Sequence, residues 1–311
     1  MRRIWGVVCL VLAVLLIAGA AVVKWVAAPA LVKIPLSLNS VTVSTGTAQA
    51  YILANQAVST VQVVATRTVT GDVKAGTSSV VVYDEVLCLR AATTKATPDR
   101  YGCVPQTDPG FLDRTTDRIA FDRKSAMPVA DEARFKANVN GDAKIAHTGL
   151  DYTFPIDTKK QTYPFFDPTA GKSFPIVYQG AEKVDGLRTY RFQQQVPTSN
   201  IQLAGIFPGT YSNLVTVWVE PTTGIIVKGS EDATEKFAKS GSIAYQGKVI
   251  FTDQTVKEQV RFAKDELNKV RLVRSWLPGG ALIIGLILLI LGVVLARGSG
   301  TGKAQPISSH T

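Results

Sequence analysis

Histidine and cysteine are scarce in this 311-residue chain, which has two histidines and three cysteines. Only one histidine, His147, lies outside the C-terminal tail, so a two-histidine metal motif cannot form. The sequence also lacks a G-x-S-x-G elbow and a P-loop. A Ser/His/Asp triad would depend on His147, which follows a polar stretch near Gly149 and is expected to be a solvated loop residue. We therefore expect a non-enzymatic protein with no catalytic residue, no metal and no cofactor.

Acidic residues are absent from both ends of the chain. All 24 lie within residues 34–268, whereas nine of the 34 basic residues lie in or beside the two flanks. The remaining 25 basic residues nearly balance the acids, so the formal charge of +10 does not indicate a nucleic-acid partner. The flanking cations suit anionic lipid headgroups. Because both short tails are basic, we expect both in the cytoplasm and the middle segment outside the membrane.

Charge is also absent from two long apolar runs, residues 4–23 and 275–296. Each matches the roughly 20 residues of a transmembrane helix and is too long for a strand. Arginine and tryptophan residues that suit a membrane interface flank the runs: Arg2, Arg3, Trp5, Trp25, Arg274, Trp276 and Arg297. The first run has an alternative interpretation as a signal peptide, although it exceeds the usual core of about 7–15 residues. We predict a two-pass protein of the plasma membrane.

The middle segment contains two cysteines, Cys88 and Cys103. In an oxidising compartment an even pair favours a disulfide, here closing a loop of about 15 residues. The alternative, a metal site, needs more ligands than two cysteines and one histidine supply. The third cysteine, Cys9, lies inside the first apolar run and is interpreted as a small apolar residue of that helix.

Short β-rich runs separated by turn residues dominate the first half of the middle segment, at residues 41–47, 51–54, 59–70 and 78–88. Similar runs follow at residues 118–123, 173–179, 187–196, 214–219, 225–228 and 243–252. They predict a membrane-anchored α+β protein whose extracytoplasmic domain is predominantly antiparallel β. Residues 131–135 fit either one helical turn or a loop.

The hydrophobic period changes after residue 255. Val256, Val260, Ala263, Leu267 and Val270 follow helical spacing and lead directly into the second apolar run. The segment is interpreted either as a stalk helix or as an ordinary helix packed on the core. The expected organisation is a cytoplasmic tail, a helix, a β-rich domain, a stalk, a second helix and a disordered tail, with boundaries at 1–3, 4–23, 24–254, 255–274, 275–296 and 297–311.

Aromatic residues and prolines are concentrated between residues 152 and 190. Prolines at this density exclude a central strand, so these segments are expected at an edge or in loops. The aromatic side chains could line an apolar groove for a lipid tail. The candidates are Phe154, Tyr163, Phe165, Phe166, Phe174, Tyr178, Tyr190 and Trp218. The alternative is that they fill the core beneath proline-rich loops.

Three phrases carry a resemblance to a known family: KQTYPFFD at 160–167, VDGLRTYRF at 184–192 and VWVEPTTG at 217–224. With the order of anchor helix, β-rich domain and second helix, the chain resembles the actinobacterial porin PorA family of two-pass envelope proteins. The resemblance implies a role in building the cell envelope, and in mycolate-bearing relatives the handling of glycolipid or lipoglycan precursors. The porin label conflicts with the two apolar helices, because an outer-membrane barrel crosses with strands.

These observations lead to one favoured function and two alternatives. We expect a protein that binds a membrane lipid or glycolipid outside the plasma membrane and assists its transfer or envelope assembly. The second expectation is a scaffold for other envelope-synthesis membrane proteins. A pore-forming protein is the third. Nucleic acid is not an expected partner.

Overall fold

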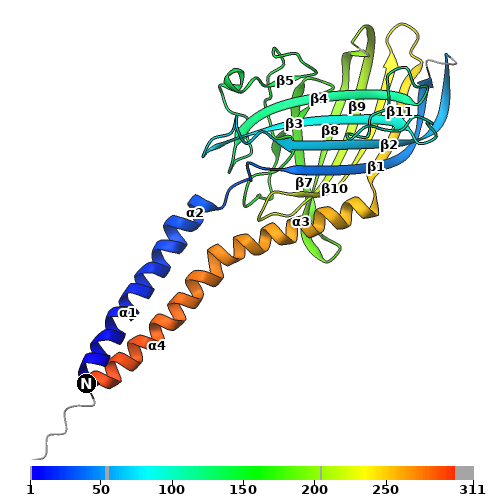
Figure 1. Ribbon diagram of the computed structural model, residues 1–311. Coiled ribbons are helices and arrows are strands. Elements are labelled where there is room, and N and C mark those ends of the chain that lie inside the picture. The colour runs from blue at the N-terminus through cyan, green and yellow to red at the C-terminus, as the bar shows by residue number, and fades with distance from the viewer. Residues whose placement is uncertain (1, 53–55, 204, 298–311) are drawn as a thin grey trace, which may run out of the picture. The chain divides into compact units, whose positions relative to one another are not determined.

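The computed structural model describes residues 2–52, 56–203 and 205–297, so Met1 and the tail predicted to be disordered lie outside the described residues, except for Arg297. The chain divides into two units (Figure 1). One comprises residues 33–266, and the other comprises the described parts of residues 1–32 and 267–311. Apolar helices at the two ends of the chain flank a domain of antiparallel strands, which confirms the predicted α+β fold class.

The unit of residues 33–266, here called the β unit, contains an eleven-stranded sheet in the order β5-β4-β3-β2-β1-β11-β10-β9-β8-β7-β6. The strands are β1 (Asn39–Ile52), β2 (Ala57–Gly71), β3 (Val80–Ala91), β4 (Phe111–Asp122), β5 (Asn138–Val139), β6 (Tyr163–Asp167), β7 (Lys172–Val184), β8 (Leu187–Leu203), β9 (Phe207–Val219), β10 (Ile226–Phe237) and β11 (Ile243–Phe251). Every neighbouring pair is antiparallel. The sheet thus consists of two meanders, which are joined by the pairing of β1 with β11. In this pairing Ala48 lies opposite Gly247.

The close pairing of β1 with β11 depends on small residues. A Cβ atom added to Gly46 would lie 1.8 Å from the carbonyl oxygen of Lys248, and one added to Gly247 would lie 2.4 Å from the Cβ of Ala48. Larger side chains at these positions would force the two strands apart. The sequence interpretation divided β1 into two strands, whereas the structure has one continuous strand of 14 residues.

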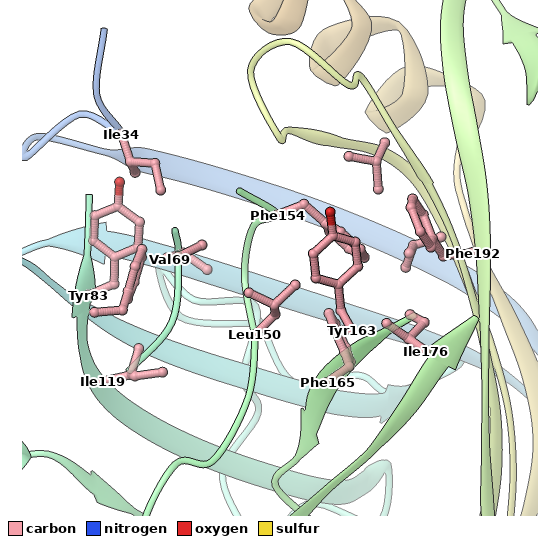
Figure 2. Close-up of a cluster of buried hydrophobic side chains, with 14 of the residues drawn as sticks. Ile34, Val69, Tyr83, Ile119, Leu150, Phe154, Tyr163, Phe165, Ile176 and Phe192 are labelled. Atoms are coloured by element: carbon pink, nitrogen blue, oxygen red, sulfur yellow. The ribbon is translucent and has the colours of Figure 1, made fainter. Parts of the chain in front are cut away.

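The core of the β unit is enclosed by both meanders (Figure 2). Leu150 and Phe154, on the connection between β5 and β6, lie between side chains of β3 and β4 and side chains of β6, β7 and β8. The rings of Phe154 and Phe192 are 4.7 Å apart between centroids. Apolar burial of this kind is the main stabilising contribution to such a domain. The connection therefore fills the interior of the curved sheet.

The proline-rich segment forms the edge of the sheet, as predicted. Strand β6 is the terminal strand on one side, and Pro164 lies opposite Pro175 of β7. Proline has no N–H group to donate to a neighbouring strand. It is therefore best tolerated in an edge strand, which has a partner on one side only. Residues 131–135 adopt the helical alternative, a 3₁₀ turn η2 at Glu132–Phe135.

Helix α3 (Asp253–Arg271) begins on the β unit. The backbone N–H of Thr255 is donated to the hydroxyl of Thr252, which caps the helix, and Asp253 complements the helix dipole. The hydroxyl of Thr255 also donates to the carbonyl oxygen of Val43 at 3.0 Å. The apolar positions Val256, Val260 and Ala263 are buried. These contacts fix the start of α3 on strand β1.

The other unit, here called the helical unit, contains α1 (Arg2–Val22), η1 (Val23–Ala27), α2 (Ala28–Leu31), η3 (Leu272–Trp276) and α4 (Leu277–Arg297). Residues 2–31 and 253–297 form helices that are long and apolar enough to cross a membrane. The large apolar side chains on α1 and α4 are mostly exposed, including Leu15 and Ile287. Such surfaces suit contact with lipid or with other helices.

Helices α1 and α4 pack through small residues spaced seven apart. The buried positions are Gly6, Ala13 and Ala20 on α1 and Pro278, Gly285 and Gly292 on α4. A Cβ atom added to Gly292 would lie 3.0 Å from the carbonyl oxygen of Gly6, so the two backbones are in direct contact. A seven-residue spacing keeps one seam facing the partner helix.

The π-helical segments η1 and η3 lie at the charged ends of the two apolar runs. Each contains one basic residue and one tryptophan, Lys24 with Trp25 and Arg274 with Trp276. Both indole rings are well exposed. Basic and tryptophan side chains together suit a membrane–water boundary, and π-helical turns often mark functional positions in helices.

Candidate functional site

Charged side chains continue the apolar rows on the inner face of strands β2, β3 and β4. Alternation in β3 places Glu85 on the same face as Val81 and Tyr83, and in β4 it places Asp117 on the face of Ile119. The sheet register puts Glu85 directly opposite Asp117. Like charges opposite each other on one face are destabilising, so this pair requires neutralisation.

His147 lies against this pair and is buried, with 5% of its surface exposed. Its Nε2 atom is 2.9 Å from Oδ1 of Asp117, and its Nδ1 atom is 3.0 Å from Oε1 of Glu132. The ring also packs on Phe166 at 4.7 Å between centroids. The expectation of a solvated loop histidine is therefore wrong, because the β5–β6 connection enters the interior of the sheet.

The pKa of His147 follows from its two carboxylate neighbours. Burial by itself would lower the pKa, but hydrogen bonds to Asp117 and Glu132 outweigh burial and raise it to about 10. Both ring nitrogens are engaged by carboxylates, so the ring is not free to act as a general base. In a Ser/His/Asp triad one ring nitrogen faces a serine hydroxyl, whereas here both face carboxylates.

Asp151 lies four residues further along the same connection and is also buried. Burial and the neighbouring Asp117 and Glu85 raise its pKa well above the ordinary value. Its Oδ2 atom has no hydrogen-bond partner among the described residues. The adjacent Tyr152 donates its hydroxyl to Oδ2 of Asp117 at 2.6 Å. Asp117 is thus held from two sides, whereas Asp151 keeps one oxygen unsatisfied.

Arg67 of β2 connects this cluster to the other meander. Its Nη1 atom is 3.3 Å from Oε2 of Glu85, and its Nη2 atom is 3.4 Å from Oε1 of Glu231 on β10. The pKa of Glu85 is raised to about 7, because burial outweighs the attraction of Arg67 and the nearby Asp117 adds repulsion. The arginine therefore only partly compensates the buried acid.

The charges of the cluster do not balance when every group is ionised. The buried or nearly buried acids are Glu85, Asp117, Glu132 and Asp151, and the basic side chains are Arg67 and His147. Four carboxylates exceed two cations by two negative charges. Uncompensated charge in a protein interior is costly, so protons or a bound cation must supply the difference. Asp117, His147 and Asp151 each offer one ligand atom, and these atoms all lie within 4.8 Å of one another. This ionic cluster is the candidate site.

The eight aromatic residues predicted as a lipid groove do not form one surface. Phe154, Tyr163, Phe165 and Phe166 are buried, with at most 8% of their surface exposed. Phe174, Tyr178, Tyr190 and Trp218 are half-buried. The indole N–H of Trp218 donates to Oε1 of Glu182 on a neighbouring part of the sheet. Phe154, Tyr163 and Phe165 belong to the core cluster, and Tyr178 and Tyr190 pack against it. Phe166 packs on His147.

The remaining predicted residues lie as follows. Cys88 of β3 forms a disulfide with Cys103, with Cα atoms 5.1 Å apart, which confirms that prediction. Cys9 is a free cysteine of α1. Trp5, Trp25 and Trp276 are each more than 60% exposed. Arg2 and Arg297 are the first and last residues of the helices that carry them.

The ionic cluster was not predicted, although the sequence contains an alternating pattern that indicates part of it. An acid at the end of an alternating apolar row, as in Val81-x-Tyr83-x-Glu85, places a carboxylate on the buried face. The mirrored row Asp117-x-Ile119-x-Phe121 carries the same signal. His147 and Asp151 lie in no such pattern, because their burial depends on where the connection runs.

Two relatives resemble the chain over much of its length. A protein of Corynebacterium resistens named Porin PorA is 25% identical, and the match covers 68% of this chain and 72% of the relative. A protein of Corynebacterium amycolatum with the same name is 26% identical, with coverage of 68% and 69%.

These names correct the functional expectation. The favoured expectation, a lipid or glycolipid carrier, is contradicted because the relatives are named as porins, and the scaffold alternative is not favoured either. Burial of Phe154, Tyr163, Phe165 and Phe166 agrees with the alternative interpretation, in which these side chains fill the core. The model of the family described as Porin PorA matches residues 5–294, which include both apolar helices and the whole β unit. The chain therefore belongs to the PorA family, as the resemblance of its sequence phrases predicted.

Proposed function

We propose that this chain is a non-enzymatic, pore-forming membrane protein whose conducting path is made by its apolar helices. The observation that carries the proposal is the family match over residues 5–294, together with the porin names of the relatives. Residues 2–31 and 253–297 supply the two membrane-length apolar helices. The strands of the β unit supply no continuous apolar outer band, since their exposed positions are rich in threonine, serine and charged residues.

The path lies between copies of the protein rather than inside one copy. The interior of the β unit is filled by core side chains such as Leu150 and Phe154, which are 0% exposed. Within the helical unit, Gly6 and Gly292 bring the backbones of α1 and α4 into contact, so the pair encloses no channel. Exposed apolar faces of several helix pairs must therefore surround the path.

We further propose that both termini face the cytoplasm and that the β unit lies outside the plasma membrane. Arg2 and Arg3 precede the first apolar run, Arg297 and Lys303 follow the second, and neither tail contains an acid. An excess of basic residues in short tails favours the cytoplasmic side. The Cys88–Cys103 disulfide agrees with an oxidising compartment for the β unit.

Planar-bilayer recording of the purified full-length protein tests this function. We expect discrete conductance steps whose frequency rises more steeply than linearly with protein concentration, because several copies form one path. Inserted protein that gives no steps at any concentration would contradict the proposal. Steps that rise linearly would contradict the multi-copy path while leaving pore formation intact.

A further inference from the structure

We propose that Asp117, His147 and Asp151 form a binding site for one divalent transition-metal ion of the zinc class. The ion fastens the β5–β6 connection to strand β4 inside the β unit. His147 and Asp151 come from this connection, and Asp117 comes from the strand. The inference is independent of the proposed pore, because all three residues belong to the β unit.

The first support is the distance between the three ligand atoms. They already lie within 4.8 Å of one another. Zinc binds histidine nitrogen at about 2.0–2.1 Å and carboxylate oxygen at about 2.0–2.2 Å, so donors on one tetrahedral ion are roughly 3.4 Å apart. Nε2 of His147 and Oδ1 of Asp117 are 2.9 Å apart, so only small side-chain movements separate the three atoms from this spacing.

The second support is the unsatisfied oxygen of Asp151. Asp151 is 7% exposed, and its Oδ2 atom meets no hydrogen-bond donor among the described residues, since the side chain beside it is a second acid, Asp117. Buried polar atoms normally find a partner, and a bound cation is one of the partners that explain an exception. An ion held with Asp117 and His147 would supply the missing interaction.

The third support is that further side chains form hydrogen bonds with the proposed ligands His147 and Asp117. Nδ1 of His147 is held by Glu132, and Nε2 is 2.9 Å from Oδ1 of Asp117, so the ion would replace the Nε2 proton, which is released on binding. Tyr152 holds the other oxygen of Asp117. Metal-binding histidines almost always donate their second nitrogen to a carboxylate or carbonyl group, and binding carboxylates are themselves hydrogen-bonded.

The fourth support is charge. With every group ionised the cluster has two more carboxylates than cations, and a divalent ion bound to a neutral His147 would reduce this excess to one. A donor set of one imidazole and two carboxylates suits zinc and related transition metals, whereas calcium and magnesium prefer oxygen ligands alone. Zinc is therefore the appropriate probe.

The test uses full-length protein in detergent, stripped of metal with a chelator and passed through a desalting column. Zinc is then added, and bound metal is measured by mass spectrometry of the eluted protein and by calorimetric titration. We expect one zinc ion per chain. Asp151→Asn and His147→Gln should abolish stoichiometric binding, and Glu132→Gln should weaken it by about 10–100-fold, as outer partners do in other sites.

Asp167→Asn is the matched control, because Asp167 is another buried acid of the β unit and is bonded to Tyr211 instead. This variant should bind zinc like the wild type. Less than a tenth of an equivalent on the wild type, or unchanged binding by Asp151→Asn, would overturn the proposal. Cobalt substitution of the wild type covers the case in which the variants fail to fold. Intense visible bands of a tetrahedral ion with nitrogen and oxygen donors would support the site, and their absence would overturn it.

Discussion

The helical unit and the β unit differ in the size and polarity of the side chains that they bury. Helices α1 and α4 meet through glycine and alanine, with large apolar side chains directed outward. The β unit buries large aromatic rings and, beside them, an ionic cluster around His147. A hydrocarbon environment gives no hydrophobic reason to bury large side chains, so close backbone contact is what remains. The interior of the β unit holds both aromatic rings and ion-paired side chains.

The largest expected effect comes from the aromatic part of the β core. Phe154→Ala should lower the free energy of unfolding by about 3–5 kcal/mol, because the ring is completely buried and leaves a cavity. Phe207→Ala is the control, since Phe207 is 49% exposed, and it should cost much less. Denaturant unfolding of the full-length protein measures both. Equal losses would show that the core is not organised around Phe154.

Removal of Arg67 tests the ionic part of the same interior. Arg67→Met should lower the free energy of unfolding by about 3 kcal/mol. This value is at the lower end of the range for a broken buried ion pair, because the Arg67 side chain is 29% exposed. The double variant Arg67→Met/Glu85→Gln should recover part of this loss, because the buried carboxylate of Glu85 is then no longer left without its cation. A double variant that is less stable than the single one would contradict the charge argument.

Asp167 links stability to pH. Burial raises its pKa to about 6, although Ala170 and Tyr211 donate hydrogen bonds to it. Between about pH 4 and 6 the folded state holds this proton while the unfolded chain releases it, so stability falls as pH rises through this window. The full effect is about 2–3 kcal/mol.

Comparison with Asp167→Asn isolates this effect, since the amide does not titrate. The stability of the wild type minus that of the variant should decrease from pH 4 to pH 7 and then remain constant. A difference that stays level across this range would show that folding does not raise the pKa of Asp167.

The smallest expected effect concerns the helix pair. Gly285→Leu should weaken packing of α1 on α4 by about 1–3 kcal/mol, because an added Cβ atom would lie 2.9 Å from Ile17. Gly279→Leu is the matched control on the same helix, because an added Cβ atom meets no described atom within 4 Å. Disulfide trapping between cysteines introduced on α1 and α4 reports the packing. Equal trapping in both variants would contradict the small-residue seam.

Features that depend on nearby residues could be predicted from the sequence. The apolar runs identified both long helices, and Pro164 and Pro175 indicated the edge strand. Local alternation located most strands, but β4 begins at Phe111, seven residues before the predicted start.

Features that depend on distant pairing could not be predicted. The pairing of Ala48 with Gly247 brings together positions about 200 residues apart, and no local pattern indicates it. The burial of His147 and Asp151 follows from the path of the β5–β6 connection through the interior. The aromatic residues were correctly recognised as a group, but whether they line a groove or fill a core depends on that same path.

Cysteine mapping in bilayers tests most directly the claim that the helices form the conducting path. In a Cys9→Ser background, Ile283→Cys, Ile287→Cys and Ile290→Cys sample exposed positions of α4, and Ala13→Cys samples the helix seam. We expect a charged thiol reagent to reduce conductance at one or more of the exposed positions and not at the seam. Conductance that is unchanged at every helix position would contradict a path made by the helices, above all if a cysteine within the β unit responds instead.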